Sequence, residues 1–259
     1  MQLPIEINNT LLDKIISIAW EASDAVLRLY QDKVDFCIKS DNSPLTQADL
    51  ASHKIIVKKL SALTPKVPII SEESTNLEPI NWQNAQQFWL VDPLDGTKEF
   101  INNNGEFTIN IALIENNQPV LGVVSAPALN ILYAGFKEGG AIKMCKNGNR
   151  QVIGVTNLTE DGLYVVGSRS HNDVEAMNNY LLNKKVAKFI AIGSSLKFCK
   201  IAEGSAHLYP RLGYTMEWDT AAGHAILLAA GGNVEQLKGQ PLLYGKKGFK
   251  NPFFIAKAI

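Results

Sequence analysis

Two stretches near the N-terminus carry apolar residues at helical spacing. In residues 11–30, the apolar positions 12, 15, 16, 19, 26 and 27 fall on one face of a helix. Residues 46–63 repeat this spacing directly after Pro44, which favours a helix start there. The pattern therefore predicts two amphipathic helices, and the polar run of residues 39–44 between them predicts a hairpin-like loop.

Shorter apolar runs predict strands. In the first half of the chain they cover residues 67–71, 88–92, 108–115 and 120–126, with a further hairpin at 131–134 and 140–143. In the second half, predicted strands at 164–166, 189–192 and 207–209 alternate with predicted helices at 174–183, 195–203 and 220–230. This order predicts an α/β protein with an α+β N-terminal half and a layered α/β C-terminal half.

A polar segment at residues 152–161 is the best candidate for a boundary between these halves. No internal repeat or low-complexity linker interrupts the chain. We therefore expect halves at residues 1–155 and 156–259 that pack as one compact unit. With 259 residues, 46% of them hydrophobic, the chain can bury a large core.

Charge and targeting signals exclude several classes of function. The 25 basic and 25 acidic residues give a formal net charge of zero, which predicts no extended surface for nucleic acid or membrane. Residues 1–13 lack the regions of a signal peptide, and no apolar run approaches the ~20 residues that span a bilayer. Cys37, Cys145 and Cys199 are widely spaced, as expected for reduced core thiols. We expect a cytoplasmic protein without a transmembrane segment, with peripheral attachment to the cytoplasmic side of the inner membrane left open.

The most informative chemical signal follows the predicted strand at 88–92. Asp92 and Asp95 lie three residues apart, Pro93 restricts the backbone between them, and Gly96-Thr97 opens the next segment with free backbone N–H groups. Carboxylates bind a hard cation and amides bind an anion, so this stretch predicts a metal site beside a phosphate site. The alternative is that Asp95 caps a helix beginning near Gly96 and that Asp92 is a surface turn residue.

Four further acids occupy the ends of predicted elements. Glu72 and Glu73 follow the strand at 67–71, and Asp219 lies at the start of an apolar helix. Asp49 lies near the start of the helix at 46–63, where it could also be an ordinary first-turn acid.

Together these motifs resemble the lithium-sensitive, magnesium-dependent phosphatases typified by inositol monophosphatase. The resemblance covers nearly the whole chain and rests on Ser71-Glu72-Glu73, the Asp-Pro-Leu-Asp-Gly-Thr loop at 92–97 and the Trp-Asp-x-x-Ala-Gly sequence at 218–223. Residues 167–171 and 209–219 are similar to the bacterial CysQ branch, the 3'(2'),5'-bisphosphate nucleotidases. The resemblance implies an αβαβα sandwich that removes the 3'-phosphate of 3'-phosphoadenosine 5'-phosphate (PAP) to give AMP, with PAPS as a second substrate, in support of sulfate assimilation.

The resemblance also implies a metal centre in the N-terminal half and a nucleotide pocket in the C-terminal half. Glu72, Asp92 and the Leu94 carbonyl would hold one ion; Asp92, Asp95 and Asp219 would hold a second, and a third, weaker ion is expected near Glu72. Each pair of converging carboxylates at ~4 Å would repel by ~4 kcal/mol at an effective dielectric of 20, so the cluster requires cations. Oxygen ligands favour Mg²⁺ or Mn²⁺ over zinc. The resemblance implies that Mg²⁺ is the working ion, that Mn²⁺ substitutes for it, and that Li⁺ and Ca²⁺ inhibit.

By the same resemblance, the nucleophile is a water held by the metals, and the catalytic residues are Glu72, Thr97 and Asp49. The Thr97 hydroxyl is too weak a base to keep the proton of this water, so Asp49 would receive it through the threonine. The amides of Gly96 and Thr97 would cradle the phosphate oxygens.

A bisphosphate carries roughly twice the −1.5 to −2 charge of one phosphate monoester, so its recognition needs a second anion site. The resemblance implies that the substrate contacts include Lys39, Ser170, His171, Gly193, Ser194, Lys197, Arg211 and Asp219. From the residues alone, Arg169 is a further candidate, whereas Lys197 with Lys200 could form a solvated helix face and His171 could be a helix cap. Tyr214 stands where the branch often has proline. This difference affects the conformation of the turn at residues 213–215, and with it the direction in which the Arg211 side chain points.

Two other functions stay open. A phosphatase of the same fold that acts on inositol monophosphate or a sugar bisphosphate would use the same metals but would have no use for Lys197 and Arg211. A non-catalytic partner of transcription machinery is the third hypothesis, and the zero net charge argues against it. The expected ligand is a small-molecule nucleotide rather than a nucleic acid polymer, bound by a monomer or homodimer.

Overall fold

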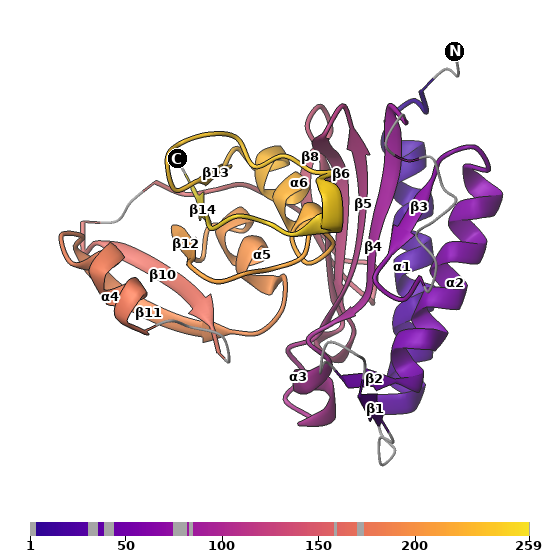
Figure 1. Ribbon diagram of the computed structural model, residues 1–259, viewed down its shortest axis with the longest axis horizontal. Coiled ribbons are helices and arrows are strands. Elements are labelled where there is room, and N and C mark those ends of the chain that lie inside the picture. The colour runs from indigo at the N-terminus through magenta and orange to yellow at the C-terminus, as the bar shows by residue number, and fades with distance from the viewer. Residues whose placement is uncertain are drawn as a thin grey trace.

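A computed structural model describes residues 4–30, 36–38, 44–74, 82, 85–157, 160–169 and 174–258 (Figure 1). In this part of the chain the elements stack in the order helices, sheet, helices, sheet, helix, which confirms the predicted αβαβα sandwich. Helices α1 and α2 cover the outer face of the larger sheet, α5 and α6 lie between the two sheets, and α4 covers the smaller sheet from outside.

Both N-terminal helices form where the apolar spacing predicts them. Helix α1 spans Asn9–Tyr30, and α2 spans Gln47–Leu63. Thr46 caps α2, because its hydroxyl accepts from the Ala48 N–H while the Asp49 side chain accepts from the Thr46 N–H. Two short antiparallel strands, β1 (Phe36–Ile38) and β2 (Pro44–Thr46), precede α2. Residues 39–43 of the predicted hairpin-like loop lie outside the described residues.

The described strands of the larger sheet follow chain order from β3 to β9. Their bounds are β3 Ile69–Ser71, β4 Gln87–Asp95, β5 Thr108–Glu115, β6 Gln118–Ala126, β7 Ile131–Phe136, β8 Gly140–Cys145 and β9 Arg150–Ile153. Strands β3 and β4 are parallel and the other neighbours are antiparallel. The predicted end of a strand at residue 92 is wrong, since β4 continues to Asp95 with a register shift between Asp92 and Asp95.

Helix α3 (Thr97–Ile101) follows β4 directly. The described strands of the smaller sheet lie in the order β11, β10, β12, β14, β13. Their bounds are β10 Leu163–Ser168, β11 Val186–Ile192, β12 Leu208–Arg211, β13 Asn233–Gln236 and β14 Phe254–Lys257. The helices of this half are α4 Val174–Leu181, α5 Leu196–Ala202 and α6 Ala221–Ala229, close to their predicted ranges. Strands β9, β13 and β14 are absent from the sequence prediction.

Strand β4 is buried on both faces because each face meets a helical layer. Trp89 and Val91 pack in the cluster that α1 and α2 share with the sheet, and Phe88 and Leu90 pack in the cluster that contains α5 and α6. Helix α6 is apolar on all sides, as expected for a helix between two sheets. The hydrophobic cluster that contains α6 includes residues from both sides of the predicted boundary at 155/156. The division of the chain into two halves at this boundary stays a prediction.

The three cysteines do not share one environment. Cys199 is buried, Cys145 is half-buried and Cys37 is exposed, and all three thiols are free. The expectation of core thiols is therefore wrong for Cys37, which lies on the short strand β1. Among the described residues, no helix has both the length and the apolar content that a membrane crossing requires.

Candidate functional site

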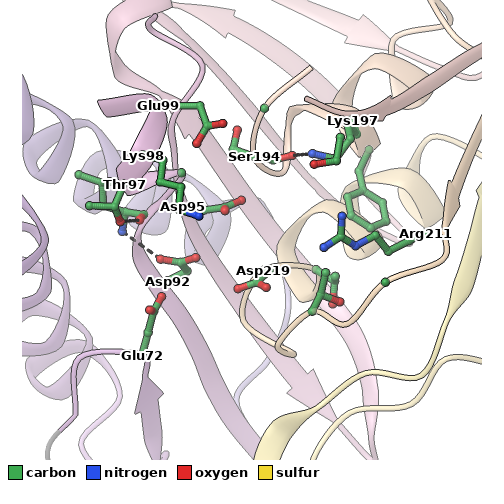
Figure 2. Close-up of a pocket in the computed structure, with 18 of the residues that line it drawn as sticks. Glu72, Asp92, Asp95, Thr97, Lys98, Glu99, Ser194, Lys197, Arg211 and Asp219 are labelled. Carbon is green, nitrogen blue, oxygen red and sulfur yellow. Dashed lines mark hydrogen bonds between the residues drawn. The ribbon is translucent and has the colours of Figure 1, made fainter. Parts of the chain in front are cut away.

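A cavity of about 580 Å³ opens where the two halves of the chain meet (Figure 2). The ends of β3 and β4, helix α3, the start of α5, the end of β12 and the segment before α6 supply its walls. Its acidic lining comprises Glu72, Asp92, Asp95, Glu99 and Asp219. Its basic lining among the described residues comprises Lys98, Lys197 and Arg211.

Three of these acids converge. Among the described residues, Glu72, Asp92 and Asp219 each offer a carboxylate oxygen, and these oxygens lie within 4.8 Å of one another. Parallel pairing of β3 with β4 aligns Ser71 with Val91, which places Glu72 beside Asp92. Asp219 reaches the same point from the segment before α6, and Figure 2 shows the three side chains pointing toward one another.

Backbone donors hold two of these carboxylates in place. The Leu94 N–H donates to Asp92 Oδ1 at 3.0 Å, and the Met216 N–H donates to Asp219 Oδ2 at 2.8 Å. Burial, followed by the charges of Glu72 and the neighbouring aspartates, raises the pKa of Asp92 well above its usual range. Burial and the charges of Asp95 and Glu72 likewise raise the pKa of Asp219. The pKa shifts have the sign expected where several carboxylates share one buried site.

Asp95 faces a different partner. The Ser195 hydroxyl lies 3.0 Å from Asp95 Oδ2 and 2.5 Å from the Asp219 carbonyl, and it accepts from Asn110 Nδ2 at 2.9 Å. Burial raises the pKa of Asp95, against the opposing effects of Lys197 and of the Ser195 hydrogen bond. Helix α3 does begin after Gly96, but no side chain caps it, so the capping alternative for Asp95 is wrong.

The Thr97 hydroxyl lies beside Asp49. Thr97 Oγ1 is 3.3 Å from Asp49 Oδ1 and 3.4 Å from the Leu94 carbonyl, within reach of donating to either. The other carboxylate oxygen, Asp49 Oδ2, accepts from the Thr46 N–H at 2.8 Å and from the Thr46 hydroxyl at 2.6 Å. Asp49 is therefore both the first-turn acid of α2 and a partner for Thr97, because its two oxygens serve the two contacts.

Lys197 and Arg211 lie across the cavity from Glu72 (Figure 2). Lys197 Nζ donates to the Ser194 carbonyl at 2.5 Å and to the Ile192 carbonyl at 3.3 Å. Burial lowers the pKa of Lys197 to about 8, although the charge of Asp95 acts in the opposite direction. Lys197 is 5% exposed, so the alternative of a solvated helix face is wrong for it. Arg211 Nη2 donates to the Tyr214 carbonyl at 2.9 Å, a contact that depends on the backbone of residue 214 rather than on its side chain.

Comparisons with known proteins assign the chain to a family. The pattern of the inositol monophosphatase family matches residues 8–252. The chain belongs to the inositol monophosphatase family. It is 48% identical over 250 residues to the 3'(2'),5'-bisphosphate nucleotidase CysQ of Escherichia coli K12, with 94% of this chain and 98% of the relative covered. It is 47% identical to the protein of the same name from Buchnera aphidicola, with 96% and 94% covered.

A solved structure agrees with this assignment. The crystal structure of CysQ from Bacteroides thetaiotaomicron, described as a bacterial member of the inositol monophosphatase family, matches with a TM-score of 0.84 and 41% identity. The match covers 96% of this chain and 97% of that one. The similarity therefore extends over nearly the whole chain.

Several residues predicted from the family resemblance lie outside the described residues, namely Lys39, Ser170 and His171. Gly96, Thr97, Gly193 and Ser194 line the cavity, and so does Leu94. Arg169 is not among its lining residues; it forms an ion pair with Glu106 at 2.8 Å, so its assignment as an anion-binding residue of the cavity is wrong.

Lys98, Glu99 and Tyr209 are among the lining residues that the sequence prediction did not assign to the site. Lys98 and Glu99 follow Thr97 on α3 and face the cavity, as Figure 2 shows. The sequence did contain a signal for Lys98 and Glu99, namely the predicted helix start near Gly96. The first turn of a helix that begins at the cavity must also border the cavity. Tyr209 lines the cavity with its ring centroid 5.4 Å from Lys197 Nζ.

Proposed function

We propose that the protein hydrolyses the 3'-phosphate of PAP to give AMP and phosphate, and that PAPS is a second substrate. One observation carries the proposal: a carboxylate cluster and two cationic side chains face each other across one cavity. The cluster suits a phosphate bound through cations, and Lys197 with Arg211 suits a second anionic group bound directly. The Escherichia coli and Buchnera aphidicola relatives carry the name of a bisphosphate nucleotidase, which supports the same assignment.

The donor set fits Mg²⁺. Glu72, Asp92 and Asp219 would hold it through oxygen atoms, and the Leu94 carbonyl and Asp95 are further proposed ligands. Bound Mg²⁺ supplies charge neutralisation and Lewis acidity for hydrolysis of a phosphate ester. We propose two or three ions, replacement by Mn²⁺ and inhibition by Ca²⁺. Li⁺ is close to Mg²⁺ in size with half its charge, so we also expect inhibition by Li⁺.

The proton of the attacking water would pass to Thr97 and then to Asp49. The 3.3 Å separation of Thr97 Oγ1 from Asp49 Oδ1 supports this route. Glu72 acts in the same step by orienting the attacking water. Gly96 and Thr97 line the cavity, and their backbone amides would hold the phosphate oxygens. In-line attack would then break the bond between phosphorus and the ribose 3'-oxygen, which leaves as the hydroxyl of AMP after taking up a proton from solvent water.

The second anionic group of the substrate would contact Lys197, Arg211 and the Gly193–Ser194 turn. Ser194 supports this assignment, because its buried hydroxyl oxygen has no hydrogen-bond partner in the described part of the chain. Ser170, His171 and Lys39 stay predicted substrate contacts. We further propose a cytoplasmic protein that acts as a monomer or homodimer.

Phosphate release tests the proposal. With Mg²⁺ present, we expect turnover of PAP to exceed that of inositol 1-phosphate, and EDTA to abolish both. Preference for inositol 1-phosphate would keep the metal centre but overturn the substrate assignment. No release from either compound would favour the binding-partner hypothesis.

A matched pair of variants tests the second anion site. Lys197→Gln should reduce the preference for PAP over inositol 1-phosphate at least tenfold, since a charge-assisted contact to phosphate is lost. Lys188→Gln is the control, because Lys188 is exposed on β11 and lies outside the cavity lining. Equal effects of the two substitutions would contradict a direct role for Lys197.

A further inference from the structure

Glu106 connects the two halves of the chain without lining the cavity. It lies between α3 and β5, and its side chain is 23% exposed. Glu106 Oε2 accepts from the Gly193 N–H at 2.8 Å. The same carboxylate accepts from Arg169 in a bidentate arrangement, at 2.8 Å between Nη2 and Oε1 and at 3.2 Å between Nε and Oε2.

Arg169 extends this connection to the smaller sheet. It directly follows β10, and its Nη2 also donates to the Ala191 carbonyl on β11 at 3.1 Å. The guanidinium therefore joins the ends of β10 and β11 to one carboxylate of the N-terminal half. A bidentate pair of this kind fixes direction as well as distance.

The Gly193–Ser194 turn is pressed against the segment that carries Glu106. A Cβ atom at Gly193 would lie 2.8 Å from the Glu106 carbonyl oxygen and 3.0 Å from Glu99 Cγ, so only glycine fits there. Ser194 has a φ of 49°, in the left-handed region that side chains seldom adopt. On the cavity side, Lys197 Nζ donates to the Ser194 carbonyl. Glu106 and Lys197 thus each hold the turn through a hydrogen bond to its backbone.

We propose that Glu106 and Arg169 are positioning residues that hold the Gly193–Ser194 turn in the shape needed to bind the second anionic group of the substrate. This inference rests on the proposed function, because the turn and Lys197 form the proposed second anion site. Removal of the Glu106 side chain releases the Gly193 N–H and the Arg169 guanidinium, so the turn loses a hydrogen bond that holds it against the N-terminal half. The distance between the second anion site and the carboxylate cluster is then less tightly fixed.

The direction in which KM changes when Glu106 is removed distinguishes a positioning role from a purely electrostatic effect of its charge. Glu106 is an anion near an anion site, so its removal would lower KM for a bisphosphate if only its charge mattered. A positioning role predicts the reverse. Glu106→Ala should raise KM for PAP roughly tenfold, as expected for loss of hydrogen bonds to a charged group, and should change kcat little. Glu106→Gln keeps an acceptor for the Gly193 N–H and should lie between Glu106→Ala and the wild type.

The experiment compares PAP with adenosine 3'-monophosphate, which lacks the second phosphate. Glu106→Ala should leave kcat/KM for the monophosphate within about twofold of the wild-type value. Glu235→Ala is the matched control, because Glu235 also pairs with a cation, Lys257 at 2.6 Å, and its side chain is 26% exposed. Equal losses for both substrates, or a lower KM for PAP, would overturn the inference.

Hydrogen exchange gives a readout that does not depend on activity. The peptide covering residues 190–196 should exchange faster in Glu106→Ala than in the wild type or in Glu235→Ala. Unchanged exchange would overturn the positioning role even if turnover of PAP is confirmed. If the wild-type protein does not hydrolyse PAP but Glu106→Ala still exchanges faster, the proposed function is rejected and the positioning role of Glu106 is retained.

Discussion

Asp92 carries a charge that suits the proposed metal site but lowers the stability of the folded protein. It is 1% exposed at the point where β4 meets the cavity, with Glu72 and Asp219 close by. Burial and these neighbouring charges raise the pKa of Asp92, so its ionised form is unfavourable in the protein without metal. A residue chosen only for stability would not carry this charge here.

Substitution of Asp92 by Asn should separate stability from activity. Without metal, we expect Asp92→Asn to raise the free energy of unfolding by about 0.5 to 2 kcal/mol, because a repelling charge is removed while the shape is kept. Phosphate release should fall to background. Urea unfolding in EDTA measures the first effect and a phosphate assay measures the second.

The control for this substitution is Asp13→Asn. Asp13 pairs with Arg150 at 3.4 Å on the surface, where its side chain is 59% exposed. Its replacement should change the free energy of unfolding by less than about 0.5 kcal/mol. A less stable Asp92→Asn protein in EDTA would contradict the idea that the carboxylates repel one another.

At the scale of elements, close approach of α6 to β6 brings Asp219 to the cavity. Gly122 lies on β6, and a Cβ atom there would be 2.2 Å from the Ala222 carbonyl oxygen and 2.9 Å from Ala225 Cβ. The helix therefore rests on the backbone of the strand. The segment that carries Asp219 immediately precedes this contact, so the packing of α6 sets how far Asp219 reaches.

Gly122→Ala should push α6 away from the sheet. We expect a loss of about 1 to 3 kcal/mol in the free energy of unfolding, the usual effect of overpacking. Gly154→Ala is the matched control, because the nearest atom to a Cβ there, the Ala230 carbonyl oxygen, is 3.7 Å away. Urea unfolding of both variants measures the difference, and equal stabilities would show that α6 can move without a penalty.

At the scale of the whole molecule, the carboxylate cluster lies across the meeting of the two halves. Asp92 lies on β4 of the larger sheet, Glu72 directly follows β3, and Asp219 comes from the segment before α6. A cation held by all three would therefore bind the folded arrangement and not the unfolded chain. Metal binding and global stability must then be linked.

Mg²⁺ should stabilise the wild-type protein against heat. At a concentration one hundred times its dissociation constant, the expected gain is about 2.7 kcal/mol, and EDTA should reverse it. Differential scanning calorimetry with and without Mg²⁺ measures this gain. Asp92→Asn should show a much smaller response, whereas an equal response would place the stabilising ion elsewhere.

A second global property is the response of stability to acid. His224 on α6 is 3% exposed, its Nδ1 lies 2.9 Å from the Tyr244 hydroxyl, and burial lowers its pKa to about 3. Between pH 6.5 and about 3 the unfolded chain binds a proton that the folded protein does not, so stability falls as the pH drops through this window. From pH 8 to pH 5, His224 should account for a loss of about 2 kcal/mol.

His224→Asn should remove this part of the pH dependence. The difference in free energy of unfolding between pH 8 and pH 5 should shrink by about 2 kcal/mol relative to the wild type, whatever the baseline stability of the variant. Tyr244→Phe is the control, because it removes the hydroxyl but leaves the imidazole buried, and it should keep the wild-type pH dependence. An unchanged difference in His224→Asn would show that the imidazole is not buried in its neutral form.

The sequence by itself determined the features that depend on neighbouring residues. Periodic apolar positions and the Thr46–Asp49 capping box specify α2, and alternate faces of an apolar run specify β4. Acids at the ends of such elements are visible because they directly follow the apolar pattern, as Glu72 and Asp92 do. Strands β13 and β14 were missed, since short strands are defined mainly by pairing with distant partners.

Only the tertiary structure decided which distant residues meet. Asp95 faces Ser195, 100 residues away, and Glu106 holds Gly193, 87 residues away, and neither contact has a local pattern. The same holds for Arg169, whose charge suggested anion binding until its pairing with Glu106 was known. Local patterns report propensity and burial, whereas the partner of a charged side chain depends on how the two halves pack.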